Sequence, residues 1–554
     1  MSHTPRILFV SPYIPNPKAT VEADGIDFFY YRNTIGQGVF QLRQMQSWHP
    51  LHFLAQNLPV DSVVLENPTM QMFQREVERG GYDIVAFSFT VLAATRILRM
   101  VSWIKEHFPS IEAILGGYGI AALDDFSPIA TQLRSAADGI CRGEGLSFMR
   151  SYLSQRYGMN GAGPLRQDLL PTRVSLFRTR IPLARQLCFV HSLGCYYKCV
   201  FCSTSSQFGH RKVYIVSPRQ LYTLIKEAAL KHPRIDNAII YDEDFLSDRR
   251  RILQFISYLE GDEELKDHPF LLTVFSSVRS ISQYSLSELI RLRIGVLFIG
   301  VESFRREILE RETARKRTGK DIAELFHQLH SVGIHTLGSM IIGWDNQTLE
   351  NIQDEIDSFV ALNPTLYQVM PLQAPPGSPL WAAMKDEGRL LEGGLYAGVG
   401  VTSPTIRYKN FTHEEVLDCI DATHRLLVRN GGPSVFKMFE NLAHGIRTLR
   451  DLDGPEYRAR AAVYRKMISR LFLLAFMSRL MFHGQGFRTR WSAVMKEWFR
   501  EQPVRATLLG LCSLLLLPIL VFYCLGGIVL HHLSPYGEQP ETIRREYHAQ
   551  KRNG

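Results

Sequence analysis

Cys195, Cys199 and Cys202 stand close together in a short run that follows an apolar stretch at Leu187–Leu193 and the turn residue Gly194. Cysteine thiolates are the usual ligands of iron–sulfur clusters, and a closely spaced triplet can hold several corners of one cluster. On a four-iron cube, three protein ligands leave one iron free for a small molecule. The spacing therefore predicts a [4Fe–4S] cluster that can take part in chemistry.

Two other uses of cysteine compete with this interpretation. Structural zinc needs four ligands, and Cys188, His191 and His210 are near enough in the sequence to supply a fourth one. A disulfide framework is disfavoured because the chain has only eight cysteines in 554 residues, most of them scattered singly, and shows no signal peptide. This pattern is typical of a reducing cytosol, and zinc stays open as the alternative.

The composition is that of a folded protein with several domains, because 45% of the residues are apolar and 21% are charged. The formal net charge of +9 suits nucleic acid or an anionic membrane. No basic stripe interleaved with aromatic residues marks a nucleic-acid surface, so no nucleic-acid partner is expected. Basic residues instead flank an apolar segment near the C-terminus, with Arg488, Arg490, Lys496, Arg500 and Arg505 before it and Arg544, Arg545, Lys551 and Arg552 after it. A membrane lipid bilayer is therefore the expected partner.

The apolar segment Ala506–Leu530 has no charged residue over 25 positions. About 20 apolar residues suffice to cross a bilayer as a helix, and a kink at Pro518 is tolerated there. A buried core helix is the weaker alternative because so long an uncharged run is rare in soluble proteins. The sequence thus predicts a single-pass transmembrane helix that tethers the protein at the cytoplasmic side of the inner membrane, since a reduced cluster must face the cytosol.

Strand and helix patterns alternate along most of the chain and predict an α/β fold. The first part is expected to form a doubly wound parallel sheet, and six strand–helix repeats are expected to form a partial (β/α)6 barrel. The predicted ranges are 1–155 for the N-terminal domain, 156–181 for a linker, 182–404 for the barrel, 405–500 for a helical C-terminal region, 506–530 for the transmembrane helix and 531–554 for a polar tail. Reactive groups in such barrels gather at the C-terminal ends of the strands, and the cysteine loop follows the first predicted barrel strand.

The cysteine loop, with Phe201 directly before the third cysteine, resembles the cluster loop of the radical S-adenosylmethionine (radical SAM) enzymes. Family-like motifs follow in order at later strand ends, namely Tyr241–Phe245, Gly300–Ser303, Gly343–Thr348 and Pro375–Pro379. The resemblance implies roles in S-adenosylmethionine binding for Asp242 and Glu243 at the methionine amino group, for Glu302 and Ser303 at the ribose, and for Gly343. Taken without the resemblance, Asp242 or Glu302 is equally a strand-end carboxylate that caps the next helix.

The resemblance also implies the chemistry of the site. Three thiolates hold the [4Fe–4S] cluster, while the amino and carboxylate groups of S-adenosylmethionine chelate the fourth iron. An electron from a reductant such as flavodoxin or ferredoxin cleaves the sulfonium and yields a 5′-deoxyadenosyl radical. This radical abstracts hydrogen from an unactivated carbon, so the site must exclude solvent.

The N-terminal region resembles the cobalamin-binding domain that precedes the barrel in one branch of this superfamily. The matching residues are Ser88 and Thr90 after one strand, Gly116 and Gly117 after the next, and Gly143 and Glu144 at the end of the domain. An Asp-x-His-x-x-Gly motif that supplies an axial imidazole to cobalt is replaced here by Ser11–Pro15. Many members of the branch lack that histidine and still bind cobalamin. Cobalamin is therefore the expected further cofactor, with an inherited sheet that binds none as the alternative.

The stretch Gly343–Thr348 is similar to the Gly-Phe-Asp-x-Asp-Thr stretch of hopanoid methylases, although Trp344 and Gln347 depart from it. With the predicted membrane helix, it favours a membrane-anchored enzyme that methylates, couples or oxidises an unactivated carbon of a lipid or isoprenoid. A radical cyclase or oxidase with a degenerate cobalamin domain is the nearest alternative. A transfer-RNA methylthiolating enzyme is disfavoured because the further cysteine triplet of that group is missing. The alternative from another class is a non-enzymatic, membrane-tethered metal-binding protein.

Overall fold

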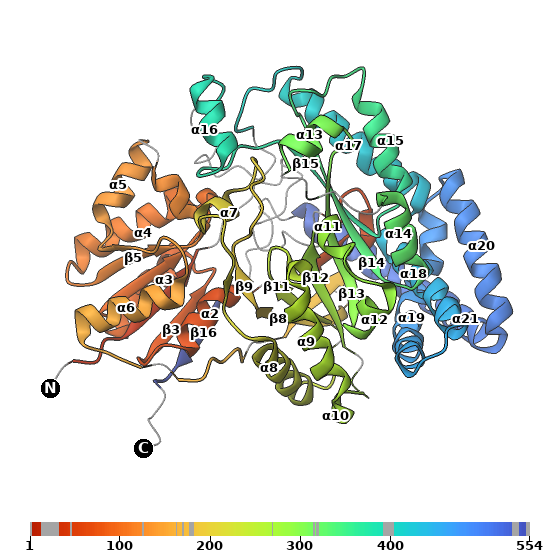
Figure 1. The fold of residues 1–554 in the computed structure, drawn as a ribbon, viewed down its shortest axis with the longest axis horizontal. Helices are drawn as coiled ribbons and strands as arrows, with labels where there is room; N and C mark the ends of the chain where they lie inside the picture. The colour runs from red at the N-terminus through yellow and green to blue at the C-terminus, as the bar shows by residue number, and fades with distance from the viewer. Residues whose placement is uncertain are drawn as a thin grey trace.

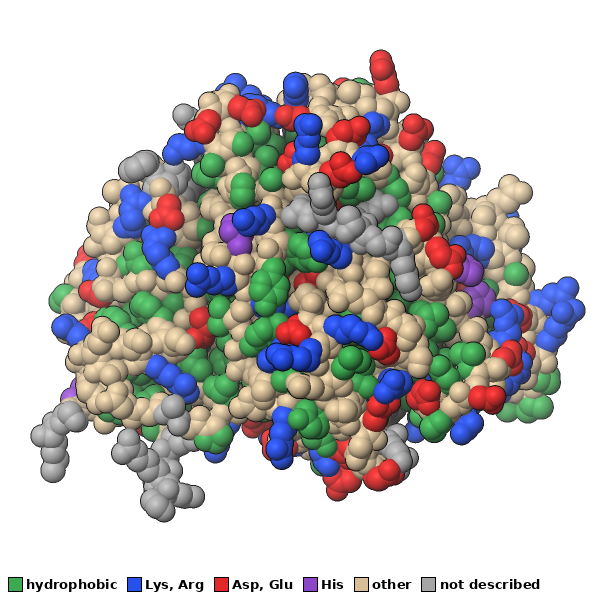
Figure 2. Space-filling view, viewed as in Figure 1, with side chains coloured by type: hydrophobic (Ala, Val, Ile, Leu, Met, Phe, Trp, Pro, Cys, Tyr) green, Lys and Arg blue, Asp and Glu red, His purple; other side chains and the backbone are tan. Residues whose placement is uncertain are grey.

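Two sheets organise the fold. A computed structural model describes residues 3–12, 33–44, 47–124, 127–161, 163–168, 171–176, 182–235, 237–266, 268, 270–313, 316, 321–391, 404–533 and 542–549. In Figure 1 an N-terminal α/β body lies beside a larger curved sheet, and a group of C-terminal helices packs on the far side of that sheet. Figure 2 shows positive and negative side chains intermixed over the face in view, so this face presents no field of a single sign.

The N-terminal sheet has six strands in the order β16-β3-β1-β4-β5-β6. The strands are β1 (Ile7–Ser11), β3 (Ser62–Glu66), β4 (Ile84–Ser88), β5 (Glu112–Gly116), β6 (Gly139–Ile140) and β16 (Ile543–Tyr547), and every pair is parallel except β16 with β3. One face packs on α3 (Met70–Gly80), α4 (Ala94–His107) and α5 (Pro128–Ala136), and the other face packs on α2 (His49–Gln56) and α6 (Gly145–Tyr157). Burial on both faces explains why the central run Ile7–Val10 is continuously apolar.

The second sheet has eight strands in the order β15-β14-β13-β12-β11-β8-β7-β2. Six of them run parallel, namely β8 (Pro182–Val190), β11 (Asn237–Tyr241), β12 (Leu271–Ser276), β13 (Ile294–Glu302), β14 (His335–Ile342) and β15 (Leu366–Pro371). The antiparallel strands β7 (Thr172–Leu176) and β2 (Leu42–Gln44) extend the sheet beyond β8. The predicted strand–helix repeats are therefore confirmed as an α/β fold with a curled half-barrel sheet.

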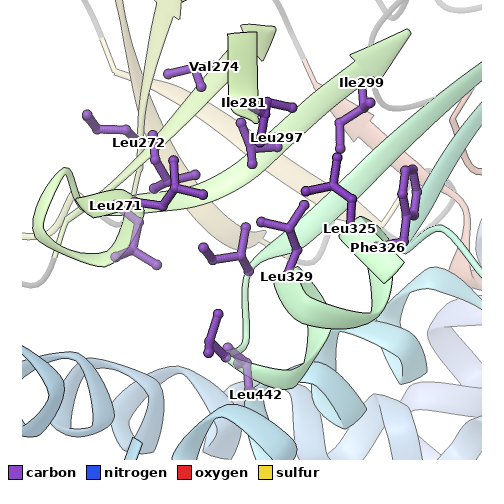
Figure 3. Close-up of a cluster of buried hydrophobic side chains, with 14 of the residues drawn as sticks. Leu271, Leu272, Val274, Ile281, Leu297, Ile299, Leu325, Phe326, Leu329 and Leu442 are labelled. Atoms are coloured by element: carbon purple, nitrogen blue, oxygen red, sulfur yellow. The ribbon is translucent and has the colours of Figure 1, made fainter. Parts of the chain in front are cut away.

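Helices on the outside of the half-barrel bury a continuous apolar core. They include α8 (Pro218–Lys231), α9 (Arg249–Glu260), α12 (Leu286–Arg291), α14 (Ile322–Ser331) and α15 (Ile352–Ala361). Ser217 and Ser285 begin α8 and α12 with capping boxes, which satisfy the free backbone N–H groups of the first helical turn. Figure 3 shows the centre of this core, with Leu271, Leu272, Val274, Ile281, Leu297, Ile299, Leu325, Phe326, Leu329 and Leu442 labelled.

The C-terminal helices continue this core rather than forming a separate one. They are α17 (His413–Gly431), α18 (Ser434–Arg450), α19 (Pro455–Met481), α20 (Gln485–Glu501) and α21 (Pro503–Leu533). Leu442 of α18 reaches the core shown in Figure 3. Tyr464 of α19 donates a hydrogen bond to the carbonyl of Val332 at 3.1 Å, and Gly445 of α18 lies against the backbone of Gly333.

The predicted transmembrane helix at residues 506–530 falls within α21. Among the residues that the structure describes, no helix is long and apolar enough to cross a membrane, so the predicted span is not confirmed. The start of α21 instead packs on the protein, where Ala506 is buried and Arg505 donates a hydrogen bond to the carbonyl of Arg465 at 2.8 Å. The segment expected to leave the protein body thus begins as part of it.

Three strands lie outside the parts that the sequence assigned to them. β2 comes from the predicted N-terminal domain but joins the barrel sheet, and β7 lies in the predicted linker. β16 lies in the predicted polar tail and pairs with the edge of the N-terminal sheet. Its Tyr547 hydroxyl lies 2.6 Å from Nδ1 of His52, so the tail is fastened by a side chain as well as by backbone pairing.

The close approach of α18 to the barrel gives a test of the packing. A Cβ at Gly445 would lie 2.8 Å from Cα of Gly333, so Gly445→Ala should lower the free energy of unfolding by about 1–3 kcal/mol. The matched helical substitution Gly510→Ala meets only an ordinary contact at 3.8 Å and should be neutral or stabilising by up to about 1 kcal/mol. Thermal and urea unfolding of both variants measure the difference. Equal stability of the two would contradict the described packing.

Candidate functional site

The cysteine loop begins at the carboxyl end of the first parallel barrel strand. β8 ends at Val190, β9 (Ser192–Leu193) follows, and Gly194 then turns the chain with φ +79°. A Cβ at Gly194 would lie 2.3 Å from the carbonyl oxygen of Arg211, so only glycine fits this turn. Cys195 and Cys199 are buried, and Cys202 precedes the short helix α7 (Ser203–Gln207). The strand end and the turn therefore position the loop.

The three thiols share one electrostatic environment. Burial raises the pKa of Cys195, and it raises the pKa of Cys199 to about 12, with the charge of Cys202 adding to both effects. Metal binding to these groups would have to release their protons. Among the described residues, no group of three His, Cys, Asp or Glu side chains is arranged around a single metal ion. A cluster held at its corners does not require the thiols to converge on one point.

Asp242 directly follows β11 and is buried with its oxygens engaged. It accepts hydrogen bonds from Nδ1 of His191 and from Oγ of Ser192, both at 2.7 Å, and pairs with Nζ of Lys212 at 2.7 Å. Burial opposes ionisation, but the His191 hydrogen bond and the Lys212 charge hold the pKa of Asp242 well below its usual range. Asp242 therefore ties the start of the cysteine loop to β11, while its expected role at S-adenosylmethionine stays a prediction.

The two carboxylate oxygens of Glu243 differ in their hydrogen bonding. Its Oε1 accepts a hydrogen bond from the Tyr118 hydroxyl at 3.2 Å, whereas its Oε2 is buried and has no hydrogen-bond partner among the described residues. Burial, followed by the charge of Asp242, raises the pKa of Glu243 to about 7. An unpartnered buried acceptor is costly, so this oxygen fits an incoming amino group such as that of S-adenosylmethionine.

Asp244 is held by hydroxyl groups that the sequence reasoning did not single out. Its carboxylate accepts hydrogen bonds from Ser276 at 2.6 Å and from Ser277 and Ser280 at 2.8 Å. Ser276 ends β12, Ser277 is the N-cap residue of the short helix α11 (Val278–Ile281), and Ser280 lies within that helix. The only local signal was a pair of serines directly after an apolar strand. The network joins the ends of β11 and β12.

Glu302 and Ser303 end β13 in different environments. Glu302 has a left-handed backbone with φ +62°, and its side chain folds back so that a Cβ at Gly300 would lie 2.3 Å from Glu302 Oε1. Such a conformation persists only where the surroundings impose it. Ser303 donates a hydrogen bond to Oε2 of Glu355 at 2.5 Å. Glu302 thus faces the site, where its charge acts on Cys199, while Ser303 is engaged within the protein.

Gly343 ends β14 in a turn that Gln347 holds. Gly343 has φ +108°, and a Cβ there would lie 2.8 Å from the ring of Tyr408. Oε1 of Gln347 accepts hydrogen bonds from the backbone N–H groups of Gly343 and Trp344, and Nε2 of Gln347 donates to Glu355 at 3.0 Å. Glu355 therefore connects this strand end with Ser303. Sequence reasoning treated Gln347 only as a departure from a family motif.

Ser88, Gly116 and Gly117 lie partly exposed at the carboxyl ends of β4 and β5. Gly117 has φ +87°, and a Cβ there would lie 2.7 Å from the carbonyl oxygen of Phe89, so this glycine serves the packing of the chain itself. At Gly116 a Cβ would meet only ordinary contacts, the nearest at 3.6 Å from Cys141. The close approach of a ligand to the backbone at Gly116 is therefore not blocked by a side chain of its own, which fits a cofactor lying at this sheet edge.

The other expected cobalamin residues differ in their availability. Thr90 precedes a short helical turn without capping it by its side chain, and Gly143 has φ +124° with open space around it. Glu144 accepts hydrogen bonds from the backbone N–H groups of Leu146 at 2.6 Å and Ser147 at 2.7 Å. Its carboxylate therefore caps α6 and is engaged.

Tyr118, next to Gly117, brings the two sheets together at the site. Besides its hydrogen bond to Glu243, it interacts with Thr204 of α7 and with the charge of Cys202. Burial and then the charge of Glu243 raise its pKa above its usual range. The carboxyl edge of the N-terminal sheet therefore faces the cysteine loop directly, and Tyr118 is a contact that neither motif predicted.

Comparison with known proteins places these features in context. The family model described as the radical SAM superfamily matches residues 189–359. The hopanoid C-2 methylase of Rhodopseudomonas palustris is 23% identical over 304 residues, which cover 52% of this chain and 55% of that protein. An uncharacterised methyltransferase of Synechocystis is 26% identical over 207 residues, which cover 36% of this chain and 37% of that protein. The match thus spans about half or less of these curated relatives.

Two solved structures share the fold. The radical S-adenosylmethionine methyltransferase TsrM from Kitasatospora setae, with cobalamin and a [4Fe–4S] cluster bound, has a TM-score of 0.52 at 12% identity and covers 84% of this chain and 99% of its own. The cobalamin-dependent S-adenosylmethionine radical enzyme OxsB has a TM-score of 0.51 at 13% identity and covers 90% of this chain and 80% of its own. At these identities the likeness concerns the fold alone. The resemblance of the cysteine loop is nevertheless confirmed by the family match, and the chain carries a radical SAM domain.

Proposed function

We propose that this chain is a radical SAM enzyme of the methyltransferase type that uses a [4Fe–4S] cluster, S-adenosylmethionine and cobalamin. The observation that carries the proposal is the hydrogen bond of 3.2 Å between Tyr118 and Glu243. It joins the edge of the N-terminal sheet to the end of the barrel where the cysteine loop lies. Cofactors bound at those two places would face each other across a short distance, as transfer of a methyl group requires.

The residues of the barrel end fit the first two cofactors. Cys195, Cys199 and Cys202 would hold the cluster, and the free Oε2 of Glu243 would receive the amino group of S-adenosylmethionine. When bound, the reduced cluster and S-adenosylmethionine supply a 5′-deoxyadenosyl radical. The protein's own part is to seat these groups, to supply an acceptor with a raised pKa at Glu243, and to bury two of the three thiols away from water.

Cobalamin is proposed at the edge formed by Ser88, Thr90, Gly116 and Gly143. The proposal is supported by the missing side chain at Gly116, by the open space at Gly143, and by the shared fold of TsrM, whose structure has cobalamin bound. Gly117 and Glu144 would shape this edge indirectly, through the turn at Phe89 and the cap of α6. A chain that binds no cobalamin would be a radical cyclase or oxidase with a degenerate domain.

The substrate class is proposed from two independent features. One relative is a hopanoid methylase, and α21 presents an apolar face made of Leu508, Leu511, Leu514, Leu515 and Ile519, each more than half exposed. Most of these positions recur at helical spacing along one side of α21. We infer that this α21 face lies on lipid at the cytoplasmic side of the inner membrane and that the substrate is a lipid or isoprenoid. Exposed Arg488, Lys496 and Arg500 on the neighbouring α20 would favour anionic headgroups.

Reduction of the cluster requires an external one-electron donor, for which flavodoxin or ferredoxin is proposed.

Cluster assembly and cleavage of S-adenosylmethionine test the enzyme directly. After anaerobic reconstitution the protein should be brown and should release 5′-deoxyadenosine from S-adenosylmethionine under reduction, because the radical forms only at an intact cluster. Cys199→Ala removes a ligand and should abolish cleavage, whereas Cys419→Ala, far along the chain on α17, should not. Colourless, zinc-loaded protein without cleavage would refute the proposal.

Cobalamin binding is tested by incubation with hydroxocobalamin, desalting and the visible spectrum. Wild-type protein should retain the cofactor. Gly116→Val should lower retention at least about tenfold, because a Cβ at this position meets only ordinary van der Waals contacts and the added side chain would occupy the sheet edge. The same change at Gly261, the C-cap of α9 in the barrel, should have no effect on retention. Equal retention by both variants would place the cofactor elsewhere.

Lipid contact is tested by co-sedimentation with vesicles that contain anionic phospholipid. Replacing Leu511 and Leu515 together by Glu should weaken binding about tenfold or more, since charge is costly in an apolar membrane environment. Leu349→Glu serves as the matched control because Leu349 is 52% exposed but lies on the barrel. If the double variant sediments with vesicles as well as wild type does, the α21 face does not bind lipid.

A further inference from the structure

Lys316, which no motif singled out, is fastened to the cysteine loop. Residues that follow α13 (Arg306–Arg311) contact the cysteine loop. The N–H of Val200 donates a hydrogen bond to the carbonyl of Glu312 at 3.0 Å. Sγ of Cys199 lies 3.2 Å from the carbonyl oxygen of Thr313. The N–H of Lys316 then donates to the carbonyl of Thr313 at 3.2 Å, and its own carbonyl accepts from Arg279 at 2.9 Å. Backbone contacts on both sides thus fix the position of this lysine.

The ammonium group of Lys316 points into the cysteine loop. Its Nζ lies 5.3 Å from the ring centroid of Tyr197, which stands between the first two cysteines. Burial works against its charge, whereas Cys199 and Cys195 in their thiolate form, followed by Asp244 and Glu302, raise its pKa above the usual range.

The neighbouring carboxylates that the structure describes do not form an ion pair with Lys316, and the neighbouring lysines do not occupy an equivalent position. Asp244 already accepts hydrogen bonds from three serines, and no carboxylate among the described residues forms an ion pair with Lys316. Lys212 is engaged with Asp242, and Lys198, although part of the cysteine loop, is exposed to solvent. Lys316 is therefore a cation held next to the thiols, and within the part of the chain that the structure describes it has no ion-paired carboxylate of its own. A charge so placed gains stability from negative charge at the thiol positions.

We propose that Lys316 raises the reduction potential of the [4Fe–4S] cluster by placing a fixed positive charge beside its thiolate ligands. This inference rests on the proposed function, in which Cys195, Cys199 and Cys202 hold the cluster. Reduction transfers one electron from a low-potential one-electron donor to the cluster and so adds one negative charge beside thiolates that are already negative. A nearby cation stabilises the reduced form more than the oxidised form, and charge near a cluster is a known determinant of its potential.

The test is a redox titration of the reconstituted full chain, followed by the electron paramagnetic resonance signal of the reduced cluster. At a fixed potential, Lys316→Met should lower the ratio of reduced to oxidised cluster about tenfold, which equals a shift of about 59 mV to more negative potential for one electron. Lys316→Arg keeps the charge and should stay near wild type. Lys198→Met is the matched control, because water screens its exposed charge and the potential should not change. Lys316→Gln is titrated in parallel, with the same expectation as Lys316→Met.

Three results would overturn the inference. The first is a potential in Lys316→Met and Lys316→Gln equal to that of wild type. The second is an equal shift in Lys198→Met. The third is an unchanged potential with weakened S-adenosylmethionine binding, which would assign Lys316 to the carboxylate of that ligand instead. Failure of this inference is distinguishable from failure of the proposed function, because wild-type protein that takes up no iron refutes both, whereas cleavage of S-adenosylmethionine with unchanged potential refutes this inference alone.

Discussion

The buried carboxylate of Asp242 is the constraint on which the rest of the site depends. Asp242 accepts hydrogen bonds from His191 and Ser192 and forms an ion pair with Lys212, each at 2.7 Å. These contacts hold the chain that follows β8 against the end of β11. Removing one partner of such a buried group leaves an uncompensated charge, which costs more than the pair itself contributes. The cysteine loop starts within a few residues of this anchor, so its geometry inherits the rigidity of two adjacent parallel strands.

Buried carboxylates also connect the other strand ends, although their hydrogen-bond partners differ from one strand end to the next. Asp244 accepts hydrogen bonds from the serines at the end of β12 and the start of α11. Glu355 accepts hydrogen bonds from both Ser303 and Gln347 at the end of the barrel sheet. The polar atoms of these side chains hydrogen-bond to one another rather than to a ligand. Glu243 is the exception, since one of its oxygens is buried without a partner among the described residues. A mostly satisfied rim with one unsatisfied acceptor is a preorganised site.

Sequence reasoning located the half-barrel and the cysteine loop because buried parallel strands are apolar runs and each run ends in a recognisable turn. It could not find Lys316 or Tyr118, which reach the site from distant segments and carry no local pattern. It also missed β16, because Ile543–Tyr547 includes three charged residues and reads as a polar tail. The apolar length of residues 506–530 was recognised, but whether such a helix packs on the protein depends on its neighbours, not on its own composition.

The return of β16 to the edge of β3 ties the last described residues of the chain to its first domain. During synthesis, the edge of the N-terminal sheet at β3 therefore stays open until the chain has been made as far as residue 547. Open sheet edges pair readily with foreign strands, so a long-lived unpaired β3 would be an aggregation hazard. The strand that closes this edge follows α21 in the chain, so the sheet can be completed only after that helix has been synthesised. Completion of the N-terminal sheet thus depends on a strand that lies beyond the barrel and the described C-terminal helices in the chain.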